Sequence, residues 1–146
     1  SMIAYLDTSA VVKLYVEEGG ATTVRRVVQE ATQVGTSRVT YAEARAAFAR
    51  RSRERGFSPA AYKELIRSFD QEWETYVRLD VTEPLIKLAG DLAERHALRA
   101  YEAIQLASAL TLQRELHAAQ IGFVAADRPL LHAAAQERLA ITRVTA

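Results

Sequence analysis

Two aspartates follow apolar segments, and their positions suggest a site for chemistry. Asp7 follows the apolar residues 3–6, Asp127 follows the apolar residues 121–126, and each precedes a segment with a helical pattern. In an open parallel sheet, ligands bind at the carboxyl ends of the strands, so two such aspartates could meet at one edge. Each aspartate alone is equally well explained as a helix cap. Only convergence with other acids makes the pair informative.

Two glutamates lie near the starts of expected helices. Glu43 ends the sequence Thr40 to Glu43, which has the pattern of a capping box, so a structural role is sufficient to explain it. The same geometry also brings its carboxylate close to the carboxyl edge of the sheet. Glu102 precedes the apolar Leu106 by four residues, which turns the carboxylate toward the core, where a charge needs a partner or a metal. The alternative for Glu102 is a favourable interaction with the helix dipole.

Four carboxylates on separate segments, in a sequence without cysteine, indicate a particular kind of metal site. Carboxylate oxygens are the ligands that Mg²⁺ and Mn²⁺ prefer. Such ions activate water and stabilise both oxygens of an in-line phosphoryl displacement, as in many nucleases. We therefore expect the four acids to hold one or two divalent ions. The three histidines lie far apart in the sequence, and we expect structural or surface roles for them (His96, His117 and His132).

The segments that must position these acids alternate between strand and helix. Apolar or alternating runs predict strands at residues 3–6, 33–37, 77–81, 121–126 and 141–144, the last at an edge. Helical periodicity and capping signals predict helices at residues 10–16, 21–32, 41–55, 59–76, 84–96, 99–116 and 128–139, with Thr8 and Ser9 as caps of the first. This alternation indicates a parallel α/β sheet with helices on both faces.

The bulk properties fit a single domain spanning residues 1–146, with Ser1 interpreted as a cloning scar. The absence of cysteine agrees with a reducing cytoplasm, where we expect the protein to reside. The first apolar run is too short for a signal peptide, and no run approaches the roughly 20 apolar residues that a membrane span needs. The net charge of +1 gives no overall attraction to nucleic acid.

Basic and aromatic side chains form two further patterns. A run of four arginines is typical of a solvated helix end, but it could also bind a phosphate backbone (Arg50, Arg51, Arg53 and Arg55). Tyr62, Phe69 and Trp73 form a stripe on one helix face, which indicates a core face or, in a small protein, a dimer or partner surface.

With these motifs in order, the sequence resembles the PIN domain, specifically the VapC type of ribonuclease toxin from toxin–antitoxin pairs. The matching stretches are residues 3–10, 37–43, 98–110 and 123–127, and the third contains Tyr101-Glu102-Ala103-Ile104-Gln105-Leu106-Ala107. The resemblance covers essentially the whole chain. It implies a three-layer α/β/α sandwich around a parallel sheet of four to five strands, and an endoribonuclease dependent on Mg²⁺ or Mn²⁺. It also implies a homodimer inhibited by a small cognate antitoxin.

The resemblance also assigns roles to individual residues. Asp7, Glu43 and Asp127 match the acidic positions of the family, and Ser9 or Thr8 matches a hydroxyl that assists beside the first acid. Glu102 stands where the family usually carries aspartate, and its longer side chain could shift a metal ligand or make it water-mediated. The hypothesis is that all four acids are catalytic, with three as metal ligands (Asp7, Glu102 and Asp127). Arginines around the pocket would hold the RNA (Arg50, Arg51, Arg53, Arg99 and Arg128).

Two other functions remain to be distinguished. Because Glu102 departs from the family pattern, the protein could be a weak or inactive nuclease that binds RNA or its antitoxin, and Glu102→Asp is the discriminating substitution. A phosphotransfer domain would share an aspartate at a strand end. It fits poorly, because the sequence Asp7-Thr8-Ser9 lacks a second acid two residues after the first.

Overall fold

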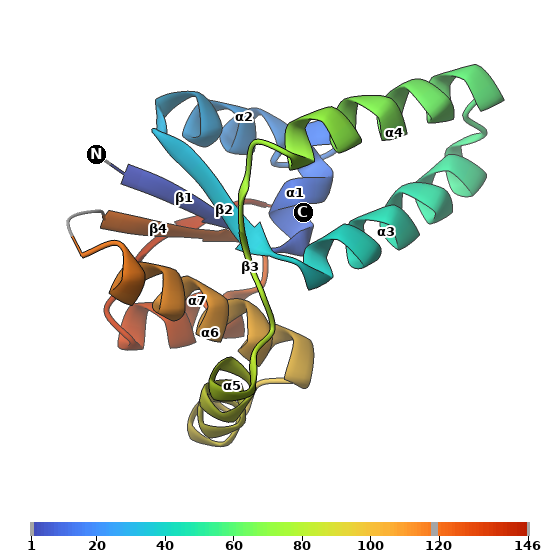
Figure 1. Cartoon of the computed structure of the whole chain (residues 1–146). Coiled ribbons are helices and arrows are strands. Elements are labelled where there is room, and N and C mark those ends of the chain that lie inside the picture. The colour runs from blue at the N-terminus through green and yellow to red at the C-terminus, as the bar shows by residue number, and fades with distance from the viewer. Residues whose placement is uncertain (1, 118–119, 146) are drawn as a thin grey trace.

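The strands of the protein form one parallel sheet in the computed structural model, which describes residues 2–117 and 120–145 (Figure 1). Ser1, interpreted above as a cloning scar, lies outside the described residues. The sheet order is β3-β2-β1-β4-β5. The strands are β1 (Met2–Leu6), β2 (Gln33–Ser37), β3 (Val77–Leu79), β4 (Gln120–Ala125) and β5 (Ala140–Arg143). The five predicted strands, including the edge position of the last, are confirmed.

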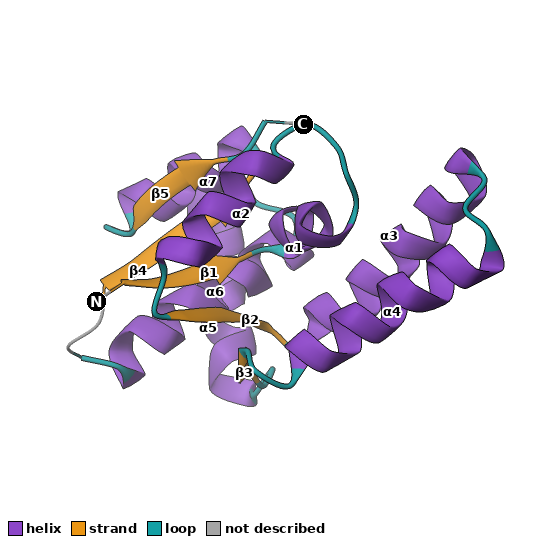
Figure 2. Cartoon of the chain, turned by 90° about the horizontal axis from the view of Figure 1, so that it is seen from above, coloured by secondary structure: helices purple, strands orange, loops and turns teal. Residues whose placement is uncertain are grey.

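Helices cover both faces of the sheet, which confirms the three-layer α/β/α sandwich (Figures 1 and 2). One face is packed by α1 (Thr8–Tyr15), α2 (Ala21–Glu30), α3 (Val39–Arg55) and α4 (Pro59–Trp73). The other is packed by α5 (Glu83–His96), α6 (Ala100–Glu115) and α7 (Arg128–Gln136). No helix in the described part of the chain is both long and apolar enough to span a bilayer.

The central strand β1 shows why the sheet is buried on both sides. Ile3 and Tyr5 point into the core with α5, α6 and α7, whereas Ala4 and Leu6 point into the core with α1 to α4. All four side chains are buried, as expected for a parallel strand between two helical layers. Tyr5 also stacks on Phe123 of the neighbouring β4, with 5.5 Å between ring centroids.

Helices α3 and α4 form a hairpin that extends away from the sheet (Figures 1 and 2). Its turn contains Gly56, whose positive φ of 64° ends α3 in the left-handed conformation that glycine tolerates best. At the base of the hairpin, Phe69 and Trp73 are buried among aromatic rings that include Tyr41. Tyr62 packs against the same core. The aromatic stripe is therefore a core face, which was the first of its two interpretations.

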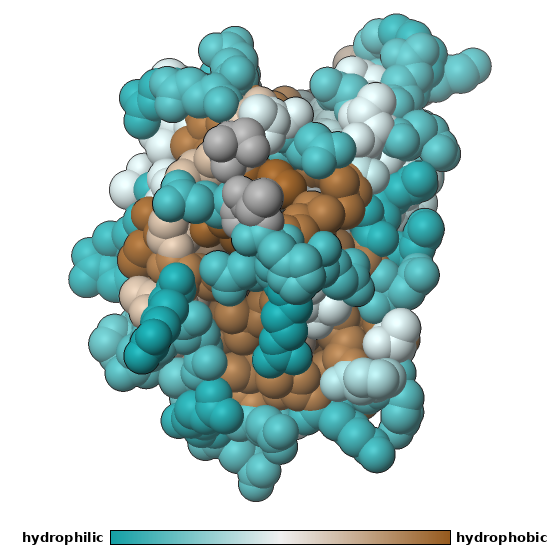
Figure 3. All heavy atoms as spheres, turned by 60° about the vertical axis from the view of Figure 1, so that its left-hand side comes forward, coloured by the Kyte–Doolittle hydropathy of each residue, from teal (hydrophilic) through white to brown (hydrophobic). Residues whose placement is uncertain are grey.

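The edge at which the strands begin differs in character from the edge at which they end. Figure 3 turns the beginning edge toward the viewer and shows hydrophobic residues gathered in its centre, with hydrophilic side chains around them. Of the acidic residues singled out by the sequence, Asp7 and Asp127 lie instead after the ends of β1 and β4, Glu43 lies near the start of α3, and Glu102 lies in the first turn of α6.

Candidate active site

The carboxyl ends of β1 and β4 bring Asp7 and Asp127 to the same edge of the sheet. The two strands pair in register up to Leu6 and Val124, and the Asp7 amide donates a hydrogen bond to the Val124 carbonyl (3.2 Å). The chain leaves β1 toward β2 on one side and later returns to β4 on the other, and ligands bind at such a reversal of strand order. The prediction that these two strand ends meet is confirmed.

Asp7 is a buried carboxylate among other acids. Its side chain is the cap of α1, since Oδ1 accepts hydrogen bonds from the Ala10 amide (3.0 Å) and the Ser9 hydroxyl (2.7 Å). Burial raises the pKa of Asp7 to about 6, against the effect of these two hydrogen bonds, and the nearby charges of Glu43 and Asp127 raise it further. The arrangement therefore holds negative charge at some cost to the folded protein.

The hydroxyls after Asp7 do not cap α1 as predicted. Helix α1 begins at Thr8, two residues before the predicted start at residue 10, so Asp7 is the cap and Thr8 lies inside the first turn. The hydroxyls are free to contact the site instead: Ser9 bonds Asp7 and accepts from the Ala126 amide (3.2 Å), and Thr8 bonds Glu43.

Asp127 follows β4, the neighbour of β1 in the sheet, and has the same geometry as Asp7. It is the cap of α7, and its Oδ2 accepts a hydrogen bond from the Leu130 amide (3.0 Å). From the sequence, each of these aspartates could be either a helix cap or part of an acidic site. The structure places both aspartates at one edge of the sheet, and each caps the helix that follows it, so the two roles coexist.

Glu43 does not form the capping box that its sequence context predicts. Helix α3 begins at Val39, whose amide donates to the Ser37 hydroxyl (3.2 Å), so Glu43 lies too far along the helix to cap it. Its Oε1 accepts a hydrogen bond of 2.6 Å from the Thr8 hydroxyl. Glu43 thus belongs to the pocket beside Asp7, and the capping interpretation is wrong.

Glu102 does cap its own helix. Its Oε1 accepts a hydrogen bond from the Arg99 amide (3.0 Å), and its Oε2 lies 3.4 Å from the Arg99 guanidinium. Partial burial acts to raise the pKa of Glu102, but these contacts with Arg99, together with an interaction with the Asp127 side chain, outweigh it and hold the pKa below its usual range. The carboxylate also lines the same pocket as Asp7 and Glu43. Glu102 therefore both stabilises the start of α6 and lines the acidic pocket.

A buried amide that sequence reasoning missed holds this region together. Gln105 is 3% exposed; its Oε1 accepts from the Tyr5 hydroxyl (2.6 Å), and its Nε2 donates to Thr8 (3.2 Å) and Thr40 (3.0 Å). Because Thr8 accepts from Gln105, its single hydrogen is available for Glu43. The available signal was a glutamine among apolar neighbours on a helix predicted to be buried, since a buried polar group needs partners.

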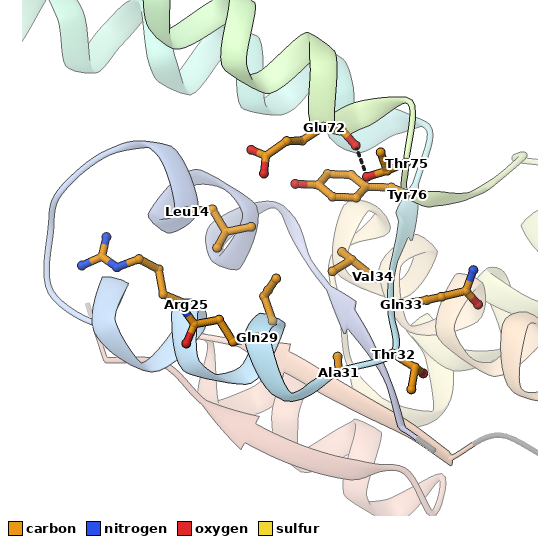
Figure 4. Close-up of a pocket in the computed structure, with 11 residues that line it drawn as sticks. Leu14, Arg25, Gln29, Ala31, Thr32, Gln33, Val34, Glu72, Thr75 and Tyr76 are labelled. Carbon is orange, nitrogen blue, oxygen red and sulfur yellow. Dashed lines mark hydrogen bonds between the residues drawn. The ribbon is translucent and has the colours of Figure 1, made fainter.

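The pocket at this edge is small, and a larger cavity lies elsewhere. The acidic pocket has a volume of about 130 Å³ and is lined by Asp7, Thr8, Glu43, Tyr101, Glu102, Gln105 and Leu130. A cavity of about 610 Å³ lies between α1, α2, the start of β2 and the end of α4 (Figure 4). Its lining includes one acid, Glu72, and one base, Arg25, and no cluster of carboxylates. Chemistry rather than size therefore identifies the candidate site.

The predicted RNA-binding arginines divide into two groups. Arg99 and Arg128 stand at the starts of α6 and α7, the helices that supply Glu102 and Leu130 to the pocket. The arginines of the run lie in the second half of α3, roughly 10 to 15 Å along the helix from Glu43 (Arg50, Arg51 and Arg53). Arg51 pairs there with Glu18, which gives it a structural role.

The histidines lie apart from the pocket lining. His96 is buried and lies 2.7 Å from the Glu137 carboxylate, which joins the end of α5 to the residue after α7. This confirms a structural role for His96, although its carboxylate partner, 41 residues away, gave no sequence signal. His117 and His132 are exposed.

The donors at the pocket suit a hard divalent cation. Among the residues that the structure describes, no basic side chain forms an ion pair with Asp7, Glu43 or Asp127. Nor do three acidic or histidine side chains in residues 2–117 and 120–145 form a preassembled metal cluster. The carboxylates that line the pocket supply the oxygen ligands that Mg²⁺ prefers, and a metal at this site stays a prediction.

Comparisons with known proteins identify the family. The model of the PIN domain matches residues 4–135, and the chain belongs to that family. The chain is 32% identical to "Ribonuclease VapC45" of Mycobacterium tuberculosis over 110 residues, which cover 75% of this chain and 76% of the relative. The resemblance to the PIN domain is thus confirmed.

Solved structures with low sequence identity share the fold. PAE2754 from Pyrobaculum aerophilum superposes with a TM-score of 0.65 at 17% identity, covering 96% of this chain and 83% of that chain. VapBC-5 from Mycobacterium tuberculosis, described as a member of the VapBC family of toxin–antitoxin systems, gives a TM-score of 0.58 at 14% identity and covers both chains completely. These likenesses support the architecture described above.

Proposed function

We propose that this protein is a divalent-metal-dependent endoribonuclease and the toxin of a toxin–antitoxin pair. One observation carries the proposal: Asp7, Glu43 and Glu102 line a single pocket at the carboxyl edge of a PIN fold, with Asp127 capping the adjacent helix. The name of its relative, a VapC ribonuclease, supports the choice of RNA as substrate. The lack of cysteine is consistent with action in the cytoplasm.

The four acids and the two hydroxyls beside them would divide the work of phosphodiester hydrolysis. Asp7, Glu102 and Asp127 would hold Mg²⁺ or Mn²⁺, which when bound supplies an activated water and offsets charge on the phosphate. Glu43 accepts a proton from the attacking water, and the Thr8 hydroxyl keeps one of its oxygens in place. Ser9 holds the Asp7 carboxylate in the same way.

The decisive experiment is cleavage of a structured RNA pool with Mg²⁺, with Mn²⁺ and with a chelator, beside the Asp7→Asn variant. Asparagine keeps the cap of α1 and the acceptor for Ser9, so the variant should fold. Cleavage that needs both the metal and Asp7 supports the proposal. If Asp7→Asn still cleaves RNA, the proposed active site is wrong.

A catalytically weak RNA-binding or antitoxin-binding module is the second candidate, and the position of Glu102 favours it. Both oxygens of Glu102 contact Arg99, so this carboxylate is less available to a metal than its neighbours. If the natural protein is inert and Glu102→Asp cleaves RNA, the second candidate is preferred. If the natural protein is active, it is rejected.

We further propose an antitoxin partner and a homodimer. The structural similarity to VapBC-5, described as part of a toxin–antitoxin system, supports the antitoxin. Light scattering of the purified protein measures the mass of the assembly. Co-expression with a cognate antitoxin should suppress the RNA cleavage described above, and unchanged cleavage in the purified complex would contradict this pairing.

A further inference from the structure

Tyr101 is an aromatic side chain that the folded core does not use. Among the large hydrophobic side chains of the described residues it is the most exposed, at 60%. The other five tyrosines each contact a core, and both hydrophobic cores in the described part of the chain form without Tyr101 (Tyr5, Tyr15, Tyr41, Tyr62 and Tyr76). Leaving such a ring in water gains nothing for folding, because its apolar area is not buried. Its position therefore needs a reason outside the core.

The position of Tyr101 is at the mouth of the acidic pocket. It lies in the first turn of α6, directly before Glu102, and lines the pocket together with Asp7 and Glu43. The start of the helix is stabilised by Glu102, which accepts from the Arg99 amide, so Tyr101 is not needed there. A large flat ring thus stands beside the carboxylates at which a phosphodiester would be cut.

The charges around Tyr101 favour a nucleic acid strand as its partner. Arg99, two residues before it, has a side chain that is 86% exposed. Arg128 is exposed at the start of α7, two residues before Leu130 of the same pocket. Cations at the starts of the two helices that line an acidic pocket can hold phosphates of a bound strand. An aromatic ring that lines the same pocket can hold a base, because bases of single-stranded RNA stack on tyrosine.

We propose that Tyr101 is a stacking platform for one base of single-stranded RNA, next to the phosphate held at the acids. This inference rests on the proposed ribonuclease function and names its substrate as an unpaired strand rather than a duplex. In a duplex the bases are already stacked on each other, and the ring could not reach their faces. Stacking accepts any base, so Tyr101 contributes affinity more than sequence selection.

The test measures binding without cleavage, in the Glu43→Gln background with Mg²⁺, because this variant keeps the three proposed metal ligands and loses the proposed proton acceptor. Short single-stranded RNAs carry the fluorescent base 2-aminopurine, or an abasic site, at each position in turn. With Tyr101 present, 2-aminopurine fluorescence should be quenched at one position, and an abasic site there should weaken binding by about 10- to 100-fold. Tyr101→Leu should remove the quenching and weaken binding of intact RNA by a similar factor. Tyr101→Phe should keep both.

Coupling between the two changes separates stacking from general damage. If the ring and the base act together, Tyr101→Leu should lose nothing more on the RNA that is abasic at that position. Ile141→Ala, at an exposed apolar residue of β5, is the matched control and should bind RNA normally. Additive losses at every position, or unchanged binding by Tyr101→Leu, would overturn the inference.

The outcome for Tyr101 is distinguishable from the outcome for the nuclease. If the natural protein cleaves RNA and Tyr101→Leu binds RNA normally, the ribonuclease function stands and base stacking on Tyr101 is rejected. If quenching occurs at one position but the natural protein never cleaves RNA, base stacking on Tyr101 stands and the ribonuclease function is rejected. Absence of any RNA binding, or tighter binding to duplex than to single strands, rejects the platform.

Discussion

Glu43 and Glu102 lie near the starts of two helices and line the same pocket, yet they are held in different ways. Glu43 accepts a hydrogen bond from Thr8, which belongs to another helix, and no basic side chain in the described residues pairs with it. Glu102 accepts from the Arg99 amide of its own helix and also lies beside the Arg99 guanidinium. The first carboxylate is held by tertiary structure, and the second by its own helix start.

The difference is electrostatic as well as geometric. The charge of Glu43 adds to the effect of burial in raising the pKa of Asp7, whereas contacts with Arg99 lower the pKa of Glu102 despite its partial burial. Glu102 therefore stabilises the fold while it lines the site. Glu43 adds to an accumulation of negative charge that a bound cation would relieve. From this contrast we expect Glu43 to matter for catalysis and Glu102 to matter also for stability.

The largest effect should come from neutralising Glu43. Glu43→Gln removes the group proposed to accept a proton from water, so kcat for RNA cleavage should fall by at least about 100-fold. The free energy of unfolding should change by less than about 0.5 kcal/mol, because glutamine still accepts from Thr8. Single-turnover cleavage and urea denaturation measure the two quantities. A stability loss as large as the catalytic loss would erase the contrast with Glu102.

The difference between these glutamates could not be predicted from the local sequence. Residues 40–43 have the pattern of a capping box, but the Ser37 hydroxyl accepts from the Val39 amide and α3 starts early. Thr40, the expected cap, bonds instead to Gln105, 65 residues away. Local patterns describe short-range hydrogen bonds, and this contact depends on how α6 packs against the sheet.

The sheet and the two aspartates were easier to predict. Nearly continuous apolar runs reveal strands buried on both faces, and Asp7 and Asp127 each follow such a run. Parallel strands have their carboxyl ends at the same edge of the sheet. Because β1 and β4 are neighbours, Asp7 and Asp127 lie close together. Catalytic roles for the acids remain a prediction from the site and the family.

The next largest effect should be a dependence of stability on pH that originates at Asp7. Its pKa rises from 3.8 to about 6 on folding, which at about 1.4 kcal/mol per pH unit costs the folded state about 3 kcal/mol at neutral pH. Between pH 4 and 6 the unfolded chain ionises Asp7 while the folded protein keeps it protonated, so stability falls as pH rises. Above pH 6 this loss is complete.

Asp7→Asn should therefore unfold at higher urea than the natural protein at pH 7.5 and at about the same urea at pH 4. Mg²⁺ added at pH 7.5 should stabilise the natural protein and not the variant, because binding to the folded state alone shifts the equilibrium. Equal stability of the two proteins at both pH values would mean that the charge at Asp7 is already compensated.

An intermediate effect is expected at Gln105, which lies on α6 with Glu102 and donates to Thr8, the hydroxyl that holds Glu43. Gln105→Met keeps the volume but leaves the buried Tyr5 hydroxyl and Thr40 without this partner, so the free energy of unfolding should fall by about 1–3 kcal/mol. Because Thr8 loses a donor, Glu43 is less firmly held, and kcat should fall more than KM changes. Gln71→Met on the exposed surface of α4 is the control and should change neither.

The smallest effect should come from removing the cap at Glu102. Glu102→Ala leaves the Arg99 amide without its acceptor, and loss of a helix cap costs about 1 kcal/mol. Glu102→Gln keeps a carbonyl oxygen for that amide and should recover most of the stability, whereas Glu43→Ala should lose little, since no helix amide depends on it. Urea denaturation of the three variants at pH 7.5 measures the difference. If Glu43→Ala and Glu102→Ala lose equal stability, helix capping does not distinguish the two carboxylates.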